Sequence, residues 1–199
     1  KVKFFDFGGR PLTSSMQVYP ENPQNKKYSV DDYWNLIKGD YSAFEFPITF
    51  KQGDGKNLMD ILETGWPNRY LISTKLKNIL EEHEFTGWTT FPVKLYDKKS
   101  NEIFGFFGFS VIGKCASIDY NKSTIIEKQH APNAPIRYYY KGKFVDLDQW
   151  DGSDFFCPEE SYEIFVTQRV AKTLKENKIT NLYLKDLNEV EINVDYVKK

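Results

Sequence analysis

The sequence predicts an α+β fold with a mostly antiparallel sheet, and two observations support this prediction. First, short runs with strand-like apolar patterns outnumber the segments with helical periodicity, and most of them follow one another as hairpins. Second, residues 70–90 are echoed without a gap by residues 164–184. The two segments read YLISTKLKNILEEHEFTGWTT and IFVTQRVAKTLKENKITNLYL. Each is typical of a strand, a helix and a second strand. We therefore expect two pseudo-repeated strand–helix–strand units whose helices pack on the sheet.

Each copy combines a short apolar run, a helix start signal and an amphipathic stretch. In the first copy we expect a strand at 70–72, Ser73 as the N-cap and a helix over 74–82. In the second copy we expect the same order from residue 164, with Thr167 as the N-cap. The identical pairs are Leu80 and Leu174, Glu82 and Glu176, and Thr86 and Thr180. The shared chemical pattern, more than residue identity, therefore supports the repeat.

The remaining elements are predicted from local signals. Ser29 begins a helix that Gly39 ends, because Ser caps backbone N–H groups and Gly stops helices. A stretch rich in Gly, Pro, Ser and Asn over 8–27 is predicted as a long loop, and 113–135 as irregular. The other predicted strands are 1–7, 44–50, 88–96, 103–112 and 191–196, with a further hairpin of 136–140 and 143–147 across Lys141-Gly142.

The length of 199 residues fits one domain with its own hydrophobic core. We therefore expect a single domain over 1–199, in which residues 56–199 form the core that contains the repeat. Whether residues 1–55 form a sub-lobe or complete the same sheet stays open at this point.

The composition argues against several classes of function. The net charge is −1 with 28% charged residues, so the chain lacks the basic footprint of a nucleic-acid-binding protein. No apolar run approaches the ~20 residues that span a bilayer, and the polar start KVKFFDFGGRPL is unlike a signal peptide. We therefore expect a cytoplasmic protein that binds neither nucleic acid nor membrane.

The few cysteines and histidines argue against metal, cofactor and nucleophile chemistry. Cys115 and Cys157 lack metal-finger spacing, and their small or apolar neighbours favour two reduced thiols in the core over a disulfide. His83 and His130 are far apart in the sequence, so neither a histidine-based metal site nor a triad is expected. There is no GxSxG elbow and no P-loop. The prediction is a non-enzymatic protein with no metal and no cofactor.

Asp146 opens the strongest local cluster of polar residues, in which Asp148, Asp151 and Asp154 follow. A calcium loop that began at Asp146 would need an oxygen ligand at its fifth position, where Trp150 stands. The cluster instead favours a turn whose carboxylates cap backbone N–H groups. The alternative is a partner-facing loop with Trp150 as its aromatic anchor.

Trp66, in the turn GWPN, is a second aromatic candidate for a binding surface. Exposed aromatic side chains on loops suit protein interfaces. The candidate partner-binding residues are therefore Asp146, Asp148, Trp150, Asp151, Asp154 and Trp66.

The paired segments YLIS…LKNILE and IFVT…LKENKIT, together with DGSDFF at 151–156, resemble a known family. It is the eleventh numbered family of bacterial polymorphic-toxin immunity proteins, first catalogued as a domain of unknown function. The resemblance covers about residues 60–190. It implies a non-catalytic cytoplasmic protein, encoded beside a toxin, that binds and blocks the toxin's active domain. No catalytic residues are carried over from the family.

Three hypotheses follow. The first is an immunity protein that neutralises a cognate toxin by occlusion, as a monomer or a weak homodimer. The second is a small-molecule- or nucleotide-binding domain, with hydrolysis by scattered carboxylates as one form of it, which would need a deep apolar pocket and a perturbed carboxylate. The third is self-association through an exposed sheet edge. No motif identifies the toxin, its chemistry or the face that binds it.

Overall fold

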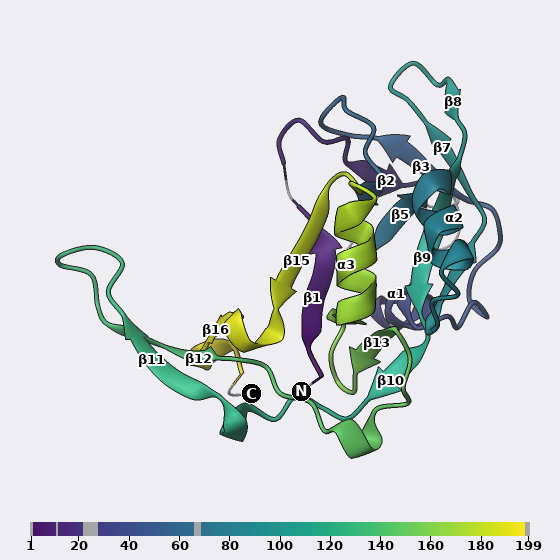
Figure 1. Ribbon diagram of the computed structural model, residues 1–199. Coiled ribbons are helices and arrows are strands. Elements are labelled where there is room, and N and C mark those ends of the chain that lie inside the picture. Colours follow the sequence, from purple (N-terminus) through teal and green to yellow (C-terminus); the bar gives the residue numbers. More distant parts are fainter. Residues whose placement is uncertain (1, 11, 22–27, 66–68, 198–199) are drawn as a thin grey trace.

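The structure is a computed structural model that describes residues 2–10, 12–21, 28–65 and 69–197 (Figure 1). Within these ranges the helices are α1 (Val30–Ile37), α2 (Thr74–Glu82) and α3 (Gln168–Glu176). The helix predicted over 74–82 is confirmed residue for residue, and the predicted α3 begins one residue after Thr167.

Two sheets, of four and five strands, form the body of the molecule. The first central sheet has the order β4-β5-β9-β6, with β4 at Ile61–Glu63, β5 at Tyr70–Ser73, β9 at Phe106–Val111 and β6 at Trp88–Phe91. The second central sheet has the order β10-β13-β14-β1-β15, with β10 at Gly113–Cys115, β13 at Phe155–Pro158, β14 at Ile164–Thr167, β1 at Phe4–Gly9 and β15 at Leu182–Asp186.

Two further sheets, of four and three strands, lie outside this body. The outer sheet has the order β2-β3-β7-β8, with β2 at Val18–Pro20, β3 at Ile48–Gln52, β7 at Val93–Tyr96 and β8 at Glu102–Ile103. The arm sheet has the order β11-β12-β16, with β11 at Thr124–Lys128, β12 at Arg137–Lys141 and β16 at Glu191–Asn193. Most neighbouring strands run antiparallel, and β3–β7 and β10–β13 are the parallel pairs among the described residues. The predicted α+β class with antiparallel-rich sheets is confirmed.

The helix starts follow from their capping residues. Ser29 accepts a hydrogen bond from the backbone N–H of Asp32, whose carboxylate accepts one from the N–H of Ser29, so α1 begins with a capping box. Ser73 caps α2 by accepting from the N–H of Leu76 at 3.1 Å. Thr167 is the N-cap residue of α3, as predicted, but its side chain makes no capping hydrogen bond. Its hydroxyl donates to the Asp154 carboxylate at 2.9 Å.

The central core lies between the two central sheets and helices α2 and α3. Alternate residues along each strand point into it, as the two-residue period of a strand requires. From the helices it receives Leu76, Ile79 and Leu80, and Val170, Ala171 and Leu174; from the strands it receives Phe7, Ile61, Ile72, Phe109, Val111, Phe155, Ile164 and Val166. The opposite face of the first central sheet packs a second cluster, and the opposite face of the second central sheet packs a third.

The N-terminal segment contributes to both sides of the body. Strand β1 lies between β14 and β15, and β3 pairs with β7. Leu36, Phe44 and Phe50 lie in the same buried cluster as Leu62 and Leu71 of the first central sheet. The N-terminal residues therefore share a sheet and a core with residues that follow them.

The segment 113–147 departs from the prediction. Residues 124–128 were expected to be irregular, yet they form β11, which pairs with β12 in the register Ile126↔Tyr139. The hairpin expected across Lys141-Gly142 is absent from the described residues, because the backbone N–H groups of Gly142 and Lys143 donate to the carbonyl oxygens of Val190 and Leu187. The chain therefore turns toward the C-terminal segment instead of back along β12.

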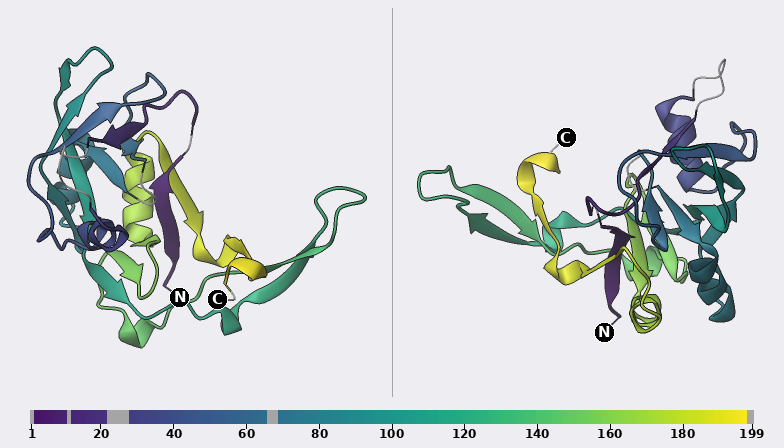
Figure 2. Two further views of the ribbon diagram at one scale, coloured as in Figure 1. Left: turned by 180° about the vertical axis from the view of Figure 1, so that it is seen from behind. Right: turned by 90° about the horizontal axis from the view of Figure 1, so that it is seen from above.

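The hairpin of β11 and β12 projects from the body as an arm, with β16 paired at its root (Figures 1 and 2). The predicted final strand at 191–196 is β16 followed by a short 3₁₀ helix (Val194–Tyr196). In the part of the chain that is described, no helix has the length and apolar character needed to cross a membrane.

Candidate functional site

Loop 146–156 contains the 3₁₀ helix η2 (Leu147–Gln149), and Asp146 is the N-cap of this helix. The Asp146 carboxylate accepts hydrogen bonds from the backbone N–H of Asp148 at 3.1 Å and from the Gln149 amide at 3.0 Å. This is the side-chain-to-backbone turn that Asp favours. The predicted capping turn is therefore present, with Leu147 and Asp148 exposed on its outer side.

Asp151 fixes the middle of the loop to strand β10. One carboxylate oxygen accepts from the backbone N–H of Ser153 at 3.0 Å, and the other accepts from the N–H of Lys114 at 2.8 Å. Burial acts to raise the pKa of Asp151, but the hydrogen bonds from Ser153 and Lys114 outweigh it and hold the pKa below its usual value. The Asp151 carboxylate therefore stays ionised while it anchors the loop.

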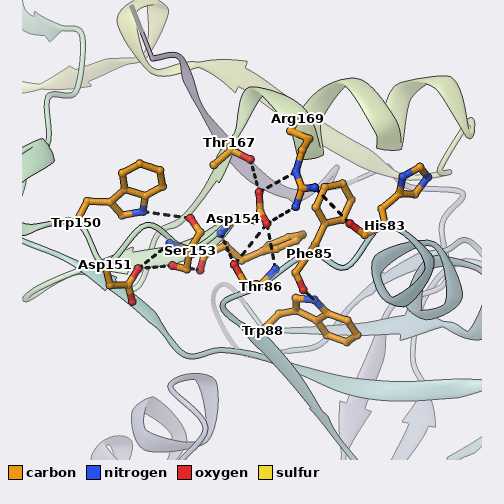
Figure 3. Close-up of polar contacts among 11 residues, drawn as sticks. His83, Phe85, Thr86, Trp88, Trp150, Asp151, Ser153, Asp154, Thr167 and Arg169 are labelled. Carbon is orange, nitrogen blue, oxygen red and sulfur yellow. Dashed lines mark hydrogen bonds and ion pairs between the residues drawn. The ribbon is translucent and has the colours of Figure 1, made fainter.

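Trp150 is half-buried at the root of the loop. Its ring packs edge-on against Phe4 at 5.0 Å between ring centroids and contacts Phe156 at 5.6 Å. Its indole N–H donates to the carbonyl oxygen of Ser153 at 3.1 Å (Figure 3). Trp150 therefore joins the loop to the third buried cluster while part of its ring remains accessible.

Asp154 points inward and organises a buried polar network (Figure 3). Its carboxylate accepts from the backbone N–H of Thr86 at 3.1 Å and the hydroxyl of Thr167 at 2.9 Å, and it pairs with the Arg169 guanidinium at 2.7 Å. Burial alone would raise the pKa of Asp154, but the bonds from Arg169, Thr86 and Thr167 lower it by more, so the net pKa is below the usual value. The ionised carboxylate is therefore a structural link between loop 146–156, α3 and the segment after α2.

The Arg169 side chain extends from this network across the end of α2. Its guanidinium lies 4.6 Å from the centroid of the Phe85 ring. The His83 ring also stacks on Phe85, with 5.6 Å between the ring centroids. Gly87 has a φ of 83°, and a Cβ there would lie 2.0 Å from the Phe155 carbonyl oxygen. Only glycine therefore permits the close approach of residues 86–87 to residues 154–155.

Asp60 makes a corresponding set of bonds at the other end of the core. Its carboxylate accepts from the hydroxyl of Ser73 at 2.8 Å and from the backbone N–H of Thr180 at 2.9 Å, with Lys75 at 3.5 Å. Burial acts to raise the pKa of Asp60, and the bonds from Thr180 and Ser73 lower it to a net value below the usual one. Sequence reasoning missed Asp60, although it precedes Asp154 by the 94 positions that separate the two echoed segments.

A second charged cluster lies where the arm meets the body. The Lys143 side chain, only 3% exposed, pairs with Glu163 at 2.6 Å and with Asp6 at 3.7 Å. The pKa of Asp6 is raised to about 6, mainly by burial. The positive charge of Lys143 lowers this pKa, and the negative charge of Glu163 raises it. No sequence motif points to this cluster, because its members come from β1, the end of the arm and the segment before β14.

The structure brings four of the predicted site residues together and turns the side chain of a fifth, Asp154, inward. Asp146, Asp148, Trp150 and Asp151 lie on one loop, and Asp154 lies behind it with its carboxylate engaged inside the protein. The prediction for Trp66 falls outside the described residues.

Neither cysteine of the chain is activated as a nucleophile. Cys115 and Cys157 are both buried and free, and burial raises the pKa of each thiol to about 12, so both stay protonated at neutral pH. They lie on adjacent strands but in different buried clusters, and hence on opposite faces of the sheet. Among the described residues, no three His, Cys, Asp or Glu side chains cluster so that they could hold a metal ion.

The comparisons with known proteins identify one family. A family model described as an immunity protein family, Imm11, matches residues 6–189 of this chain. The matched span includes both echoed segments and loop 146–156, and it extends the sequence resemblance into the N-terminal third. No curated protein matches the chain.

Proposed function

Because this chain belongs to the Imm11 immunity protein family, we propose that it binds a cognate toxin protein and neutralises it by occluding the toxin's active domain. The family match over residues 6–189 is the observation that carries the proposal. The toxin is taken to be part of a bacterial polymorphic-toxin system, encoded beside this chain. Such a protein acts in the cytoplasm, where it protects the cell that makes the toxin.

Occlusion requires a rigid surface and no chemistry by the inhibitor. The rigidity is supported by the two buried carboxylates, Asp60 and Asp154, each of which holds segments from both halves of the chain. The protonated thiols of Cys115 and Cys157 support a non-enzymatic role, because a thiol nucleophile must be ionised. We therefore infer stoichiometric inhibition, with no metal and no cofactor.

Loop 146–156 is the proposed contact surface. Asp148 and Leu147 are exposed there, and Asp146, Trp150 and Asp151 shape the loop. Asp154 contributes from inside, by fixing the position at which the loop enters β13. Trp66 remains a predicted member of the surface. A stable complex of this kind buries about 1,600 Å² in total, so residues beyond the loop must also contribute.

We further propose that the two strand–helix–strand segments are repeats of one unit. Strands β5 and β6 and helix α2 begin at residues 70, 88 and 74, whereas β14, β15 and α3 begin at residues 164, 182 and 168, each 94 higher. The strand before each unit, β4 or β13, pairs with the first strand of that unit, β5 or β14, and the paired residues differ by the same 94 positions. The corresponding pairs are Ile61↔Ile72 and Phe155↔Val166.

Strand β1 takes the place in the second central sheet that β9 takes in the first. In the first central sheet β9 lies between β5 and β6, and in the second β1 lies between β14 and β15. The strand registers also correspond. Ile72 of β5 pairs with Phe107 of β9 as Val166 of β14 pairs with Phe5 of β1. Trp88 of β6 pairs with Val111 of β9 as Leu182 of β15 pairs with Gly9 of β1. The repeat hypothesis thus explains why β1 lies between β14 and β15, although it is far from them in the sequence.

Purification of the complex tests the proposed function. The tagged chain is co-expressed with the C-terminal domain of the large protein encoded beside it, called here the neighbouring toxin domain. We expect a 1:1 complex that survives a salt wash, measured by size-exclusion chromatography with light scattering, and a monomer or weak dimer for the chain alone. Failure of the two proteins to co-purify, with a metabolite bound instead, would favour a small-molecule-binding domain.

A further inference from the structure

A hollow lies where helix α3 turns into strand β15 (Figure 1). Its lining comes from the last turn of α3, the turn that follows, β15 and the segment after β1. Its volume is about 330 Å³, within the range of roughly 300–1,000 Å³ that binding pockets have. Loop 146–156 lies elsewhere, because Trp150 contacts Phe4 at the start of β1, whereas the hollow lies beyond Gly9 at its end.

The floor of the hollow is apolar. Ile179 is buried, and Leu182 and Leu184 are half-buried against the central core. Leu12 stands at the rim and is 44% exposed. Such a floor stabilises a complex when an apolar side chain of the partner displaces water from it.

The positions 94 residues earlier in the chain carry aromatic side chains. Trp88 stands 94 positions before Leu182, and Phe85 stands 94 positions before Ile179. The indole N–H of Trp88 donates to the carbonyl oxygen of Phe85 at 2.8 Å, and the ring packs against the central core. The second unit has smaller aliphatic side chains at both positions, which fill less space. The hollow is therefore a feature of this unit and not a requirement of the proposed repeat.

The charge around the hollow is positive. Among the described residues that line it, Arg10 and Lys175 carry a charge, and both are exposed. Neither forms an ion pair with a described carboxylate, and the Lys175 ammonium lies 5.6 Å from the centroid of the Phe5 ring. Glu176, which follows Lys175 in the chain, pairs instead with Lys172 at 3.8 Å. Both cations at the hollow are therefore available to a partner.

The backbone of Arg10 is held in place. Its N–H donates to the backbone carbonyl oxygen and to the side-chain Oδ1 of Asn181, both at 3.2 Å. Asn181 is buried, and its amide donates to the carbonyl oxygen of Ile61 at 2.8 Å. Because this backbone is already ordered, less conformational entropy is lost when the Arg10 side chain binds a partner.

We propose that this hollow receives an acidic segment of the toxin domain. An apolar side chain of that segment contacts Leu182 and Leu184, and a neighbouring carboxylate pairs with Arg10 and Lys175. This inference rests on the proposed function and names the chemistry of a second contact, separate from loop 146–156. Charge complementarity selects the occupant, since cations beside an apolar floor match an Asp or Glu next to an apolar residue. Arg also binds a carboxylate through two parallel hydrogen bonds.

Nucleic acid and a second copy of the chain fit the hollow less well. None of the described lining residues is aromatic, so bases have no ring on which to stack, and two cations neutralise few phosphates. In a two-fold symmetric dimer around the hollow, Arg10 and Lys175 would face the same cations of the other copy, which is destabilising. A toxin protein with an acidic surface fits both the charge and the apolar floor.

The charge part is tested with two double variants that each remove two positive charges. Arg10→Gln with Lys175→Gln changes the hollow, and Lys94→Gln with Lys98→Gln is the control at the outer sheet. Lys94 and Lys98 are exposed, and their side chains form no ion pair with a described residue. Calorimetry measures the dissociation constant of the neighbouring toxin domain at low and high salt, and urea unfolding checks that each variant is folded.

We expect the Arg10/Lys175 variant to raise the dissociation constant by about tenfold or more at low salt, and by less at high salt, because salt screens ion pairs. The Lys94/Lys98 variant should bind within about twofold of the unmodified chain. Lys175→Arg keeps the positive charge and should also bind like the unmodified chain. Equal affinities of the two double variants would overturn the inference.

The apolar part is tested by Leu182→Trp, which introduces the side chain that stands 94 positions earlier. We expect the larger ring to fill the hollow and to raise the dissociation constant by about tenfold or more. Leu12→Ala is a second test that leaves the core unchanged, and we expect a rise of about fivefold. Its control is Val30→Ala, at a residue that is 66% exposed on α1, which should not change the affinity.

Unchanged affinity of both Leu182→Trp and Leu12→Ala would show that the hollow is not occupied. If Leu182→Trp does not fold, unchanged affinity of Leu12→Ala alone is sufficient to overturn the inference.

Two further measurements address the other occupants. Light scattering of the chain alone detects a dimer, and a dimer that the Arg10/Lys175 variant loses would overturn the inference in favour of a second copy. A single-stranded DNA probe that binds the unmodified chain but not this variant would overturn it in favour of nucleic acid. We expect no such dimer and no binding of the probe.

These outcomes are separable from failure of the proposed function. If the unmodified chain does not bind the toxin domain at all, the proposed function fails and this inference falls with it. If the unmodified chain binds and the variants at the hollow bind equally well, only the inference fails.

Discussion

Asp60 and Asp154 each accept hydrogen bonds from a threonine that follows a helix, Thr180 after α3 and Thr86 after α2. Asp60 precedes β4 and binds Thr180, which lies after α3, at 2.9 Å from the backbone N–H. Asp154 precedes β13 and binds Thr86, which lies after α2, at 3.1 Å. In both cases the threonine hydroxyl also accepts from the backbone N–H of the aspartate. Each carboxylate thus connects one central sheet to the loop of the other.

Asp154→Asn should lower the free energy of unfolding by about 2–3 kcal/mol, because the amide loses the ion pair with Arg169 and turns a donor toward groups that also donate. Equilibrium urea unfolding measures the change. Asp148→Asn is the matched control: Asp148 is exposed and its side chain makes no bond, so its unfolding free energy should stay within about 0.5 kcal/mol of the unmodified chain. A similar small loss for both variants would refute the structural role of Asp154.

Thr86→Val and Thr180→Val test the two threonine links. Each change leaves the backbone N–H bond of the threonine to the carboxylate in place, but it removes the hydroxyl that donates to the carboxylate and accepts from the backbone N–H of the aspartate. Because that N–H loses its acceptor, we expect a loss of about 1–3 kcal/mol for each. A double-mutant cycle of Thr86→Val with Asp154→Asn should show coupling, whereas Thr86→Val with Asp60→Asn should be additive. The opposite pattern of coupling would show that the pairs have been assigned wrongly.

Local signals in the sequence were sufficient for the repeat helices but not for the links between them. Ser73 and the apolar face of Leu76 and Leu80 predict α2 because capping and 3.6-residue periodicity are local properties. The bond between Thr86 and Asp154 joins residues 68 positions apart, so no local pattern reports it. Thr86 and Thr180 were nevertheless visible as an identical pair in the echoed segments.

The hairpin error has a similar cause. Residues 136–147 alternate as a hairpin would, and Lys141-Gly142 is a good turn. The turn forms differently because Val190 and Leu187, distant in the sequence, accept the backbone hydrogen bonds of Gly142 and Lys143. For the candidate site, the sequence predicts the capping turn at Asp146, but the inward direction of Asp154 depends on Arg169 and Thr167, which only the fold brings to it.

The pH dependence of stability should show a contribution from Asp6. The folded protein holds the pKa of Asp6 at about 6 by burial, above its usual 3.8, so between these values the folded state binds more protons than the unfolded state. The unfolding free energy should therefore fall as the pH rises from about 4 to 6, by up to roughly 3 kcal/mol from this group. Asp6→Asn should remove this fall, as measured by urea unfolding at several pH values.

Asp60 and Asp154 act in the opposite direction and in a lower pH range. Their folded-state pKa values are below the usual value, so the stability that they provide is present above about pH 4 and is lost as the pH falls through the lowered pKa values.

The prediction for Asp6 is contradicted if the unfolding free energy of Asp6→Asn still falls between pH 4 and 6. Another group would then cause that fall.

Trp150→Ala should weaken binding of the neighbouring toxin domain by about 2 kcal/mol or more and leave the protein folded. The packing of its ring on Phe4 and Phe156 adds an expected loss of about 2 kcal/mol in the free energy of unfolding. Trp150→Phe keeps an aromatic ring for this packing but lacks the N–H bond to Ser153. Calorimetry of binding, together with urea unfolding, separates the two effects. Unfolding of Trp150→Ala would show that the residue is only part of the core.

Titration of the neighbouring toxin domain with this chain tests the central claim most directly. The toxicity or enzymatic activity of that domain is measured at increasing molar ratios of the purified chain. The occlusion account predicts that activity falls in proportion to the chain added and is abolished at one chain per toxin domain. Full activity at a molar excess of the chain, or loss of activity at far less than one equivalent, would contradict it.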